Sequence, residues 1–206
     1  MPELALAAYG IYLLVAFGLR TAVQLRRTGQ TGFHGIGGRP GSAEWLAGVG
    51  FAIALAIGVA APVLDLADLV DPIGTLDRRG VHITGAALFL AGLAATFAAQ
   101  ISMGDSWRIG VDPAERTALV TRGAFRLVRN PIFSAMLPTS LGLALMVPSV
   151  VSFAGLLALF AALELQVRVV EEPYLRRAHG RDYAAYAARV GRFLPGVGRV
   201  PDAGGS

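Results

Sequence analysis

Long apolar stretches constrain this chain more than any other feature of its sequence. Three of them reach the length of about 20 residues that a membrane-spanning helix needs. They are residues 3–25, 43–64 and 81–103. A fourth runs from Ile132 to Val170. It is too long for one crossing, because a helix rises about 1.5 Å per residue and the hydrocarbon core is about 30 Å thick. Two crossings joined by a turn at Pro148 and Ser149 fit its length. The pattern predicts an all-α, polytopic membrane helical bundle of about five transmembrane helices, including a C-terminal helical hairpin, followed by a cytoplasmic tail helix.

The composition agrees with a membrane protein organised as a single domain over residues 1–206. Hydrophobic residues make up 54% of the chain and charged residues 16%, whereas soluble domains have about 25% charged residues. Cysteine is absent and the three histidines are far apart, so neither disulfides, thiolate catalysis nor a metal site is expected. We expect residues 1–80 to hold two spans and an outer interfacial segment, residues 81–196 to form the functional core, and residues 197–206 to be a disordered tail.

The distribution of arginine predicts the orientation. All 18 basic residues are arginine, and 16 of them fall in three regions that share one side of a five-span bundle. Only Arg78 and Arg79 fall on the other side. By the positive-inside rule, the N-terminus is outside and the C-terminus cytoplasmic. Arginines at the ends of apolar stretches serve the bilayer, so nucleic-acid binding is not expected despite the net charge of +4. The lysine-free composition favours a bacterial plasma (inner) membrane.

A first polar segment leads into the fourth span at residues 121–134. Pro131 suits the first turn of a helix, and Asn130 is a favoured N-cap. Arg129, next to the free N–H groups of a helix N-terminus, would help to hold a carboxylate or phosphate. The alternative is an ordinary capped helix whose arginines contact lipid headgroups.

A second polar segment leaves the fifth span at residues 171–190. It begins with two carboxylates, Glu171 and Glu172, which are costly at a membrane edge unless a positive group meets them. One helix face would carry acidic, basic, aromatic and apolar groups together, as a ligand of mixed polarity requires. Its members are Glu172, Arg176, His179, Tyr183, Tyr186 and Val190. The alternatives are an interfacial helix, or a helix broken at Gly180, in which case this shared face would be coincidental.

These two segments resemble the signatures of the isoprenylcysteine carboxyl methyltransferase and phospholipid methyltransferase superfamily. The run from Thr121 to Ser134 is similar to the first motif, T-x-G-P-Y-x-x-x-R-H-P-x-Y. The second segment is similar to the motif E-E-x-x-L…F-G-x-x-Y-x-x-Y…V…P. The segment from Met103 to Arg108 is similar to the G-x-x-W-R that often precedes the first motif. The resemblance covers about residues 81–196 and makes this region a methyltransferase core.

The resemblance implies an S-adenosylmethionine cofactor at the cytoplasmic face, between the last two spans and the tail. Asn130 stands at the position of the motif histidine, which helps to hold the methionine end, and Phe133 replaces the motif tyrosine. One carboxylate of the pair Glu171 and Glu172 would meet the cofactor's ammonium group. The adenosine would lie against a wall formed by Tyr183, Tyr186, Val190, Leu194 and Pro195.

The function implied is methyl transfer to a lipophilic small molecule or lipid that enters from the bilayer. Arg176 would fix an anionic acceptor, and Glu172 would act as the base for a protonated one. Two alternatives stay open. One is a membrane reductase that resembles steroid reductases and uses NADPH, and the other is a membrane protein without enzymatic activity.

Overall fold

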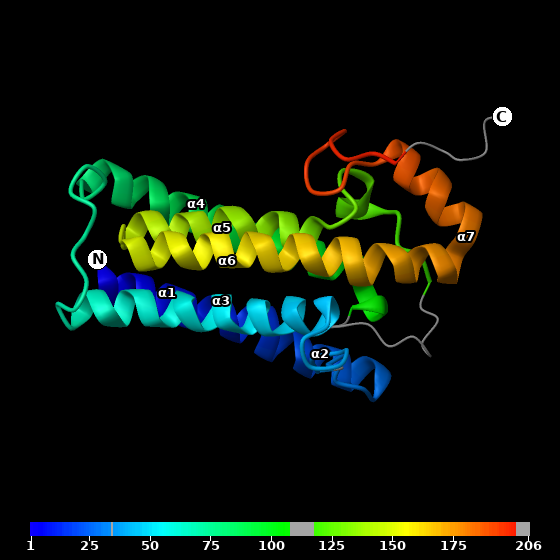
Figure 1. Ribbon diagram of the computed structural model, residues 1–206, viewed down its shortest axis with the longest axis horizontal. Coiled ribbons are helices and arrows are strands. Elements are labelled where there is room, and N and C mark those ends of the chain that lie inside the picture. The colour runs from blue at the N-terminus through cyan, green and yellow to red at the C-terminus, as the bar shows by residue number, and fades with distance from the viewer. Residues whose placement is uncertain (34, 108–117, 201–206) are drawn as a thin grey trace.

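The computed structural model describes residues 1–33, 35–107 and 118–200, and these ranges are helical without any β-strand. The first span is a continuous helix made of α1 (Pro2–Leu13), the π-helical turn η1 (Leu14–Leu19) and α2 (Arg20–Thr28). It is followed by α3 (Ala43–Leu66) and α4 (Arg79–Met103) (Figure 1). These three helices are long and apolar enough to cross a membrane. They confirm the first three predicted spans.

The long apolar stretch folds into the predicted hairpin. Its first arm is α5 (Pro131–Met146), and its second arm is α6 (Val150–Leu165). The turn between them is closed at Ser149, whose hydroxyl accepts a hydrogen bond from the backbone N–H of Ser152 (3.2 Å). From α6 the helix continues without interruption through the π-helical turn η4 (Gln166–Glu171) into α7 (Glu172–Arg189). α5 has 16 residues, or about 24 Å at 1.5 Å per residue, so it is an apolar helix shorter than the four that are long enough to cross a membrane.

Glycines set the closest helix contact of the bundle, between α4 and α5. A Cβ atom at Gly142 would lie 2.5 Å from the backbone nitrogen of Phe89 and 2.6 Å from the carbonyl oxygen of Gly85. Only hydrogen fits at this distance, because neither contact is with a side chain that could move. Close approach at small residues is the usual way for helices to associate in a membrane. On the outside of the bundle, side chains such as Leu90 and Leu157 are exposed, as expected for helices that face lipid.

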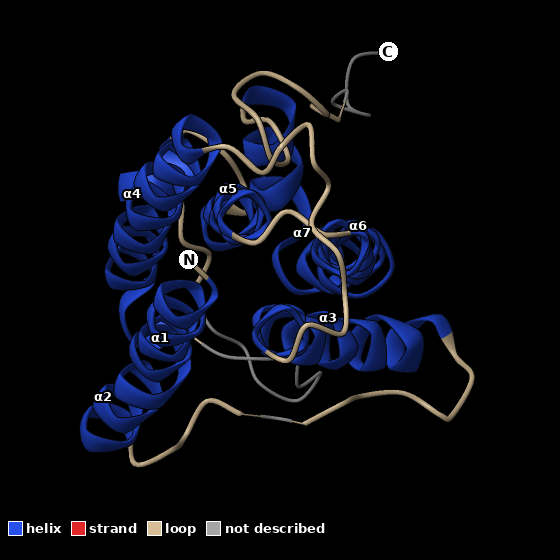
Figure 2. Cartoon of the chain, turned by 90° about the vertical axis from the view of Figure 1, so that its left-hand side faces the viewer, coloured by secondary structure: helices blue, strands red, loops and turns tan. Residues whose placement is uncertain are grey.

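The charged segments are separated between the two ends of the bundle. At one end α4 finishes, α5 begins and α7 projects from the bundle (Figure 1). We call this the arginine-rich end, and it includes α2 with Arg26 and Arg27. Arg78 and Arg79, at the start of α4, lie at the opposite end. The predicted partition of arginines is therefore present among the described residues, while Arg108 and Arg116 lie outside them. Figure 2, which views the bundle along its helices, shows that α1, α3, α4, α5 and α6 surround a common centre.

Candidate active site

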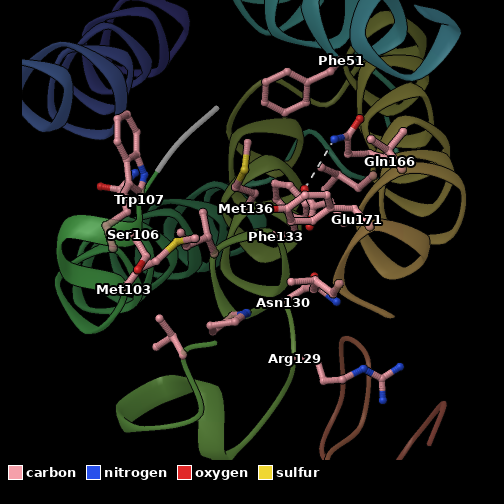
Figure 3. Close-up of a pocket in the computed structure, with 18 of the residues that line it drawn as sticks. Phe51, Met103, Ser106, Trp107, Arg129, Asn130, Phe133, Met136, Gln166 and Glu171 are labelled. Carbon is pink, nitrogen blue, oxygen red and sulfur yellow. Dashed lines mark hydrogen bonds between the residues drawn. The ribbon is translucent and has the colours of Figure 1, made fainter. Parts of the chain in front are cut away.

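A cavity of about 390 Å³ reaches from the arginine-rich end into the interior of the bundle. Its inner wall is apolar and includes Phe17, Phe51, Leu55 and Met136. Its outer wall is polar and comes from the start of α5, from η4 and from α7. Figure 3 shows Phe51 and Met136 on the inner side, with Asn130 and Arg129 towards the other end. One cavity therefore joins an apolar space within the bundle to a polar space at its end.

The π-helical turn η4 carries Glu171 and Gln166 in the cavity wall. Gln166 Nε2 donates to Glu171 Oε1 at 3.4 Å, the dashed contact in Figure 3. A π-helical turn inserts an extra residue into the helix and is frequent at functional sites. Asn130 and Phe133, at the first turn of α5, also line the cavity. The start of α5 and the turn η4 thus both contribute to the polar space.

Asn130 occupies the N-cap position of α5, but its side chain does not cap the helix. Its Nδ2 instead donates to the carbonyl oxygen of Arg192 at 3.1 Å. The backbone at Asn130 (φ −126°, ψ 62°) directs the side chain towards the C-terminal segment. The predicted N-cap position is confirmed, but the side chain does not cap the helix, because its amide joins α5 to the residues that follow α7.

Glu172 lies at the centre of a buried ion-pair cluster, which we call the Glu172 cluster and which consists of Glu172, Arg129 and Arg192. Its Oε1 accepts from Arg129 Nη2 (2.8 Å) and from Arg192 Nε (2.7 Å), and its Oε2 accepts from Arg192 Nη2 (3.1 Å). The side chains of Glu172 and Arg129 are 6% and 2% exposed. Both carboxylate oxygens are therefore committed within the protein.

The electrostatics of the cluster follow from this geometry. The apolar part of the last helix ends at Val170, so Glu172 lies beyond the spanning segment. Burial by itself raises the pKa of Glu172, but the hydrogen bonds from Arg192 and Arg129 outweigh it and hold the pKa below its usual range. In return, the hydrogen bond to Glu172 raises the pKa of Arg192. A carboxylate held in this way is a weak base, so the geometry does not support Glu172 as the proton acceptor.

Arg129 also fixes the backbone that follows α7. Its guanidinium donates to the carbonyl oxygens of Ala187 (3.1 Å), Val190 (2.5 Å) and Gly198 (3.1 Å). Its backbone N–H donates to the carbonyl of Gly191 at 2.8 Å. The guanidinium is thus used to bind protein groups, and it holds the last described residues against the start of α5. Gly198, which belongs to the segment predicted to be a disordered tail, takes part in these bonds, while residues 201–206 lie outside the described ranges.

The predicted functional face of the last helix is not continuous. Gly180 has φ 49° and ψ −119°, which breaks the helical path within α7. The expectation of one uninterrupted face from Glu172 to Val190 is therefore wrong, since only glycine adopts such a conformation readily. The break nevertheless returns Tyr183 and Tyr186 to the wall of the cavity.

The remaining predicted residues fall into two groups. Tyr183 and Tyr186 line the cavity with their rings 6.3 Å apart in an edge-on arrangement, and Tyr186 Oη donates to the carbonyl of Phe125 at 2.7 Å. Four others do not contribute to its wall, namely Arg176, Val190, Leu194 and Pro195. The Arg176 side chain is 55% exposed and stands 3.9 Å from Glu172 Oε2. Leu194 is 62% exposed, whereas Val190 packs beside the two tyrosines.

The first two spans contribute residues that the sequence did not predict for the site. Tyr12 and Phe17 in the first span line the cavity together with Phe51 in α3. Arg20, buried at 6% exposed, lies 4.9 Å from the ring centre of Trp107 and donates to the carbonyl of Gly104. This contact fixes Trp107 in the cavity wall. The sequence does not show whether an apolar residue of a span faces a cavity or the lipid. The position of Arg20 within the apolar stretch 3–25 is a signal of an interior site that the sequence of this span carries.

The polar space suits a ligand that combines charged and aromatic parts. Glu171 can accept hydrogen bonds from an ammonium group, the free N–H groups at the start of α5 favour a carboxylate, and Tyr183 and Tyr186 offer aromatic surface. S-adenosylmethionine has these three parts, and when bound it supplies an electrophilic methyl group. The residues present therefore fit the cofactor.

Fold and cavity together define a polytopic helical membrane protein with a polar site at one end of its bundle. Residues 81–182, from α4 into α7, match the family model described as phospholipid methyltransferase. The chain belongs to this family of membrane methyltransferases, which confirms the resemblance noted in the two polar segments. None of the curated proteins matches the chain.

Proposed function

We propose that this protein is an integral membrane methyltransferase that transfers a methyl group from S-adenosylmethionine to a lipophilic small molecule or lipid. The observation that carries the proposal is the single cavity that joins an apolar interior, lined by Phe17 and Phe51, to a polar end, lined by Asn130 and Glu171. A water-soluble cofactor and a bilayer-dissolved acceptor must meet, and a cavity of mixed polarity at the membrane edge allows this.

Glu171 is the carboxylate that we assign to the cofactor's ammonium group. It belongs to the cavity wall at the π-helical turn η4. Glu172 lines the same cavity, but two arginine side chains, Arg129 and Arg192, neutralise its charge, and we assign it a positioning role. Asn130, Phe133, Tyr183 and Tyr186 complete the cofactor site.

Catalysis in this proposal depends on orientation rather than on activation of the methyl group. A sulfonium methyl group is already a strong electrophile, so the protein has to align the acceptor's lone pair behind the carbon and keep water out. Orientation of this kind supplies up to about 7–11 kcal/mol. The apolar wall around Phe51 and Met136 would hold the acceptor and exclude water.

The arginine-rich end, in this proposal, faces the cytoplasm of a bacterium, where the cofactor is made. Arg26, Arg27, Arg122 and Arg126 stand at that end, against Arg78 and Arg79 at the other. The positive-inside rule then directs the N-terminus outwards and α7 inwards.

Cofactor binding is tested by the thermal stability of the purified protein in detergent. S-adenosylhomocysteine should raise the melting temperature, because a ligand that binds only the folded state stabilises it by mass action. Glu171→Gln should remove most of this shift, since it removes the charge that meets the ammonium group. Glu164→Gln is the matched control: its carboxylate pairs with Arg168 and lies outside the cavity wall, so it should keep the shift. Stabilisation by NADPH in place of S-adenosylhomocysteine would favour the reductase, and no shift with either ligand would contradict both activities.

A further inference from the structure

Three polar side chains lie together in the cavity wall within the spanning part of the bundle. They are Tyr12 of α1 and Thr96 and Gln100 of α4, with exposed fractions of 2%, 1% and 3%. Thr96 and Gln100 precede the end of α4 at Met103, so they lie about 10 and 5 Å inside the span at 1.5 Å per residue. Polar residues at this depth normally face the bundle interior and serve a function.

Within the described part of the chain, hydrogen bonding accounts for one side of the Gln100 amide and leaves the other without a partner. Its Nε2 donates to the carbonyl of Ala16, in the π-helical turn η1, at 2.8 Å. This bond fixes the orientation of the amide, and so directs Oε1 as an acceptor. Among the described residues, Gln100 Oε1 has no hydrogen-bond partner. Thr96 Oγ1 has none of good geometry either, although the Tyr12 hydroxyl lies within hydrogen-bonding reach of it. Buried polar atoms without a partner are uncommon and require an explanation.

The two atoms define the chemistry of a group that would satisfy them. Gln100 Oε1 can only accept, so the ligand must donate; Thr96 Oγ1 can either donate or accept. A hydroxyl group meets both conditions, because it donates through its hydrogen and accepts through its oxygen. The surrounding wall is apolar, with Phe17, Met136 and Met103 among its residues. The ligand is therefore apolar apart from this group.

We propose that Gln100 and Thr96 form a hydroxyl-binding subsite, so that the acceptor is a lipophilic molecule that carries a hydroxyl group. This inference rests on the proposed function for the identity of the ligand as methyl acceptor. It goes beyond that function by naming a recognition group on α4, in a part of the cavity wall separate from η4 and Glu171.

The test compares two probes that differ only in the hydrogen-bond donor: 2-bromododecan-1-ol and its methyl ether. The protein carries Trp45→Phe, which leaves Trp107 as its sole tryptophan. Because Trp107 lines the same cavity, a bromine atom bound there should quench its fluorescence. The measurement is made in lipid nanodiscs, with the probe concentration given as a mole fraction of the lipid. The alcohol should quench half of the Trp107 fluorescence at a concentration about tenfold lower than the ether does, because the ether leaves the buried acceptor of Gln100 unpaired, which disfavours binding.

Two variants remove the subsite separately. Thr96→Val deletes the hydroxyl without touching the bond from Gln100 to Ala16, and Gln100→Met deletes the acceptor. Each should reduce the preference for the alcohol to less than about threefold. Thr139→Val is the matched control, because that hydroxyl is also buried in the bundle but donates to the carbonyl of Ala135 (2.8 Å) and lies outside this cavity. It should retain the full preference.

A second measurement separates this inference from the proposed function. The shift with S-adenosylhomocysteine should be present in all three variants, which also shows that they are folded. Two results would overturn the subsite. One is equal quenching by the alcohol and the ether in the parent protein, which is expected if only water satisfies Gln100. The other is a preference for the alcohol that survives in both Thr96→Val and Gln100→Met. The protein could instead prefer the alcohol, lose that preference in Thr96→Val and Gln100→Met, and show no melting-temperature shift with S-adenosylhomocysteine. That result would support the subsite and refute the methyltransferase.

Discussion

Replacing Glu172 by glutamine removes the negative charge between Arg129 and Arg192 and should destabilise the protein severely. The carboxylate accepts three hydrogen bonds from the two guanidinium groups, at 2.7, 2.8 and 3.1 Å. A glutamine keeps one acceptor oxygen and leaves both cations without a counter-charge in a buried position. Removing one partner from a buried ion pair costs about 3–5 kcal/mol of unfolding free energy.

The assay is thermal unfolding in detergent at neutral pH, with Glu164→Gln as the reference. Glu164 and Arg168 join two adjacent turns of the same helix. Pairs of this spacing contribute about 0.2–0.5 kcal/mol to a helix, so the loss of this one should cost no more than about 1 kcal/mol. For a chain of this length, 1 kcal/mol corresponds to roughly 2–4 °C in melting temperature. We therefore expect Glu172→Gln to lower the melting temperature by about 6–20 °C and Glu164→Gln by less than about 4 °C.

The comparison can also refute the reasoning. If the two variants melt within about 2 °C of each other, the Glu172 cluster does not hold α7 and the following residues to the start of α5. The positioning role of Glu172 would then have to be abandoned, and Glu172 would return as a candidate for direct contact with the cofactor.

Three further predictions follow from the same structure. Acidification should destabilise the protein as the pH falls below the ordinary carboxyl pKa of about 4.5. The pKa of Glu172 is lower in the folded state than in the unfolded state, so its charge stabilises the fold above the unfolded pKa, and this stabilisation is lost as the pH falls through the folded pKa. The melting temperature of Glu172→Gln should lack this part of the acid dependence. Gly142→Ala should destabilise by at least about 1–3 kcal/mol through overpacking against backbone, whereas Gly10→Ala, with open space around it, should leave the melting temperature unchanged or raised. In intact cells a membrane-impermeant thiol reagent should label Asp71→Cys but not Leu194→Cys, and the reverse labelling would invert the proposed orientation.

The spans were predictable because their signal is local. Helices in a bilayer satisfy their backbone hydrogen bonds within each segment, so length and hydropathy were enough to predict α3, α4 and the hairpin with its turn at Pro148 and Ser149. The Glu171–Glu172 pair was likewise visible, because carboxylates at a membrane edge need a positive partner. The sequence did not show which arginine that partner would be.

Tertiary structure decided how the polar groups divide their roles. Arg129 precedes Glu172 by 43 residues, and Arg192 follows it by 20, so their meeting depends on how α5, α7 and the C-terminal residues pack. That packing puts Glu171 and Glu172 side by side in the cavity wall and pairs Glu172 with the two arginines. It also exposes Arg176, which helical spacing had assigned to the site, and Leu194, which the family resemblance had assigned to it.

The sequence by itself determined the class of fold, the arginine-rich end and the two polar segments, because hydropathy and charge act on each segment separately. Only the tertiary structure decided that Tyr12, Thr96 and Gln100 meet in one cavity. The physical reason is that a side chain facing lipid and one facing a cavity can have the same apolar neighbours in sequence. The helices across the space, rather than the residues beside it in the chain, determine what such a side chain can bind.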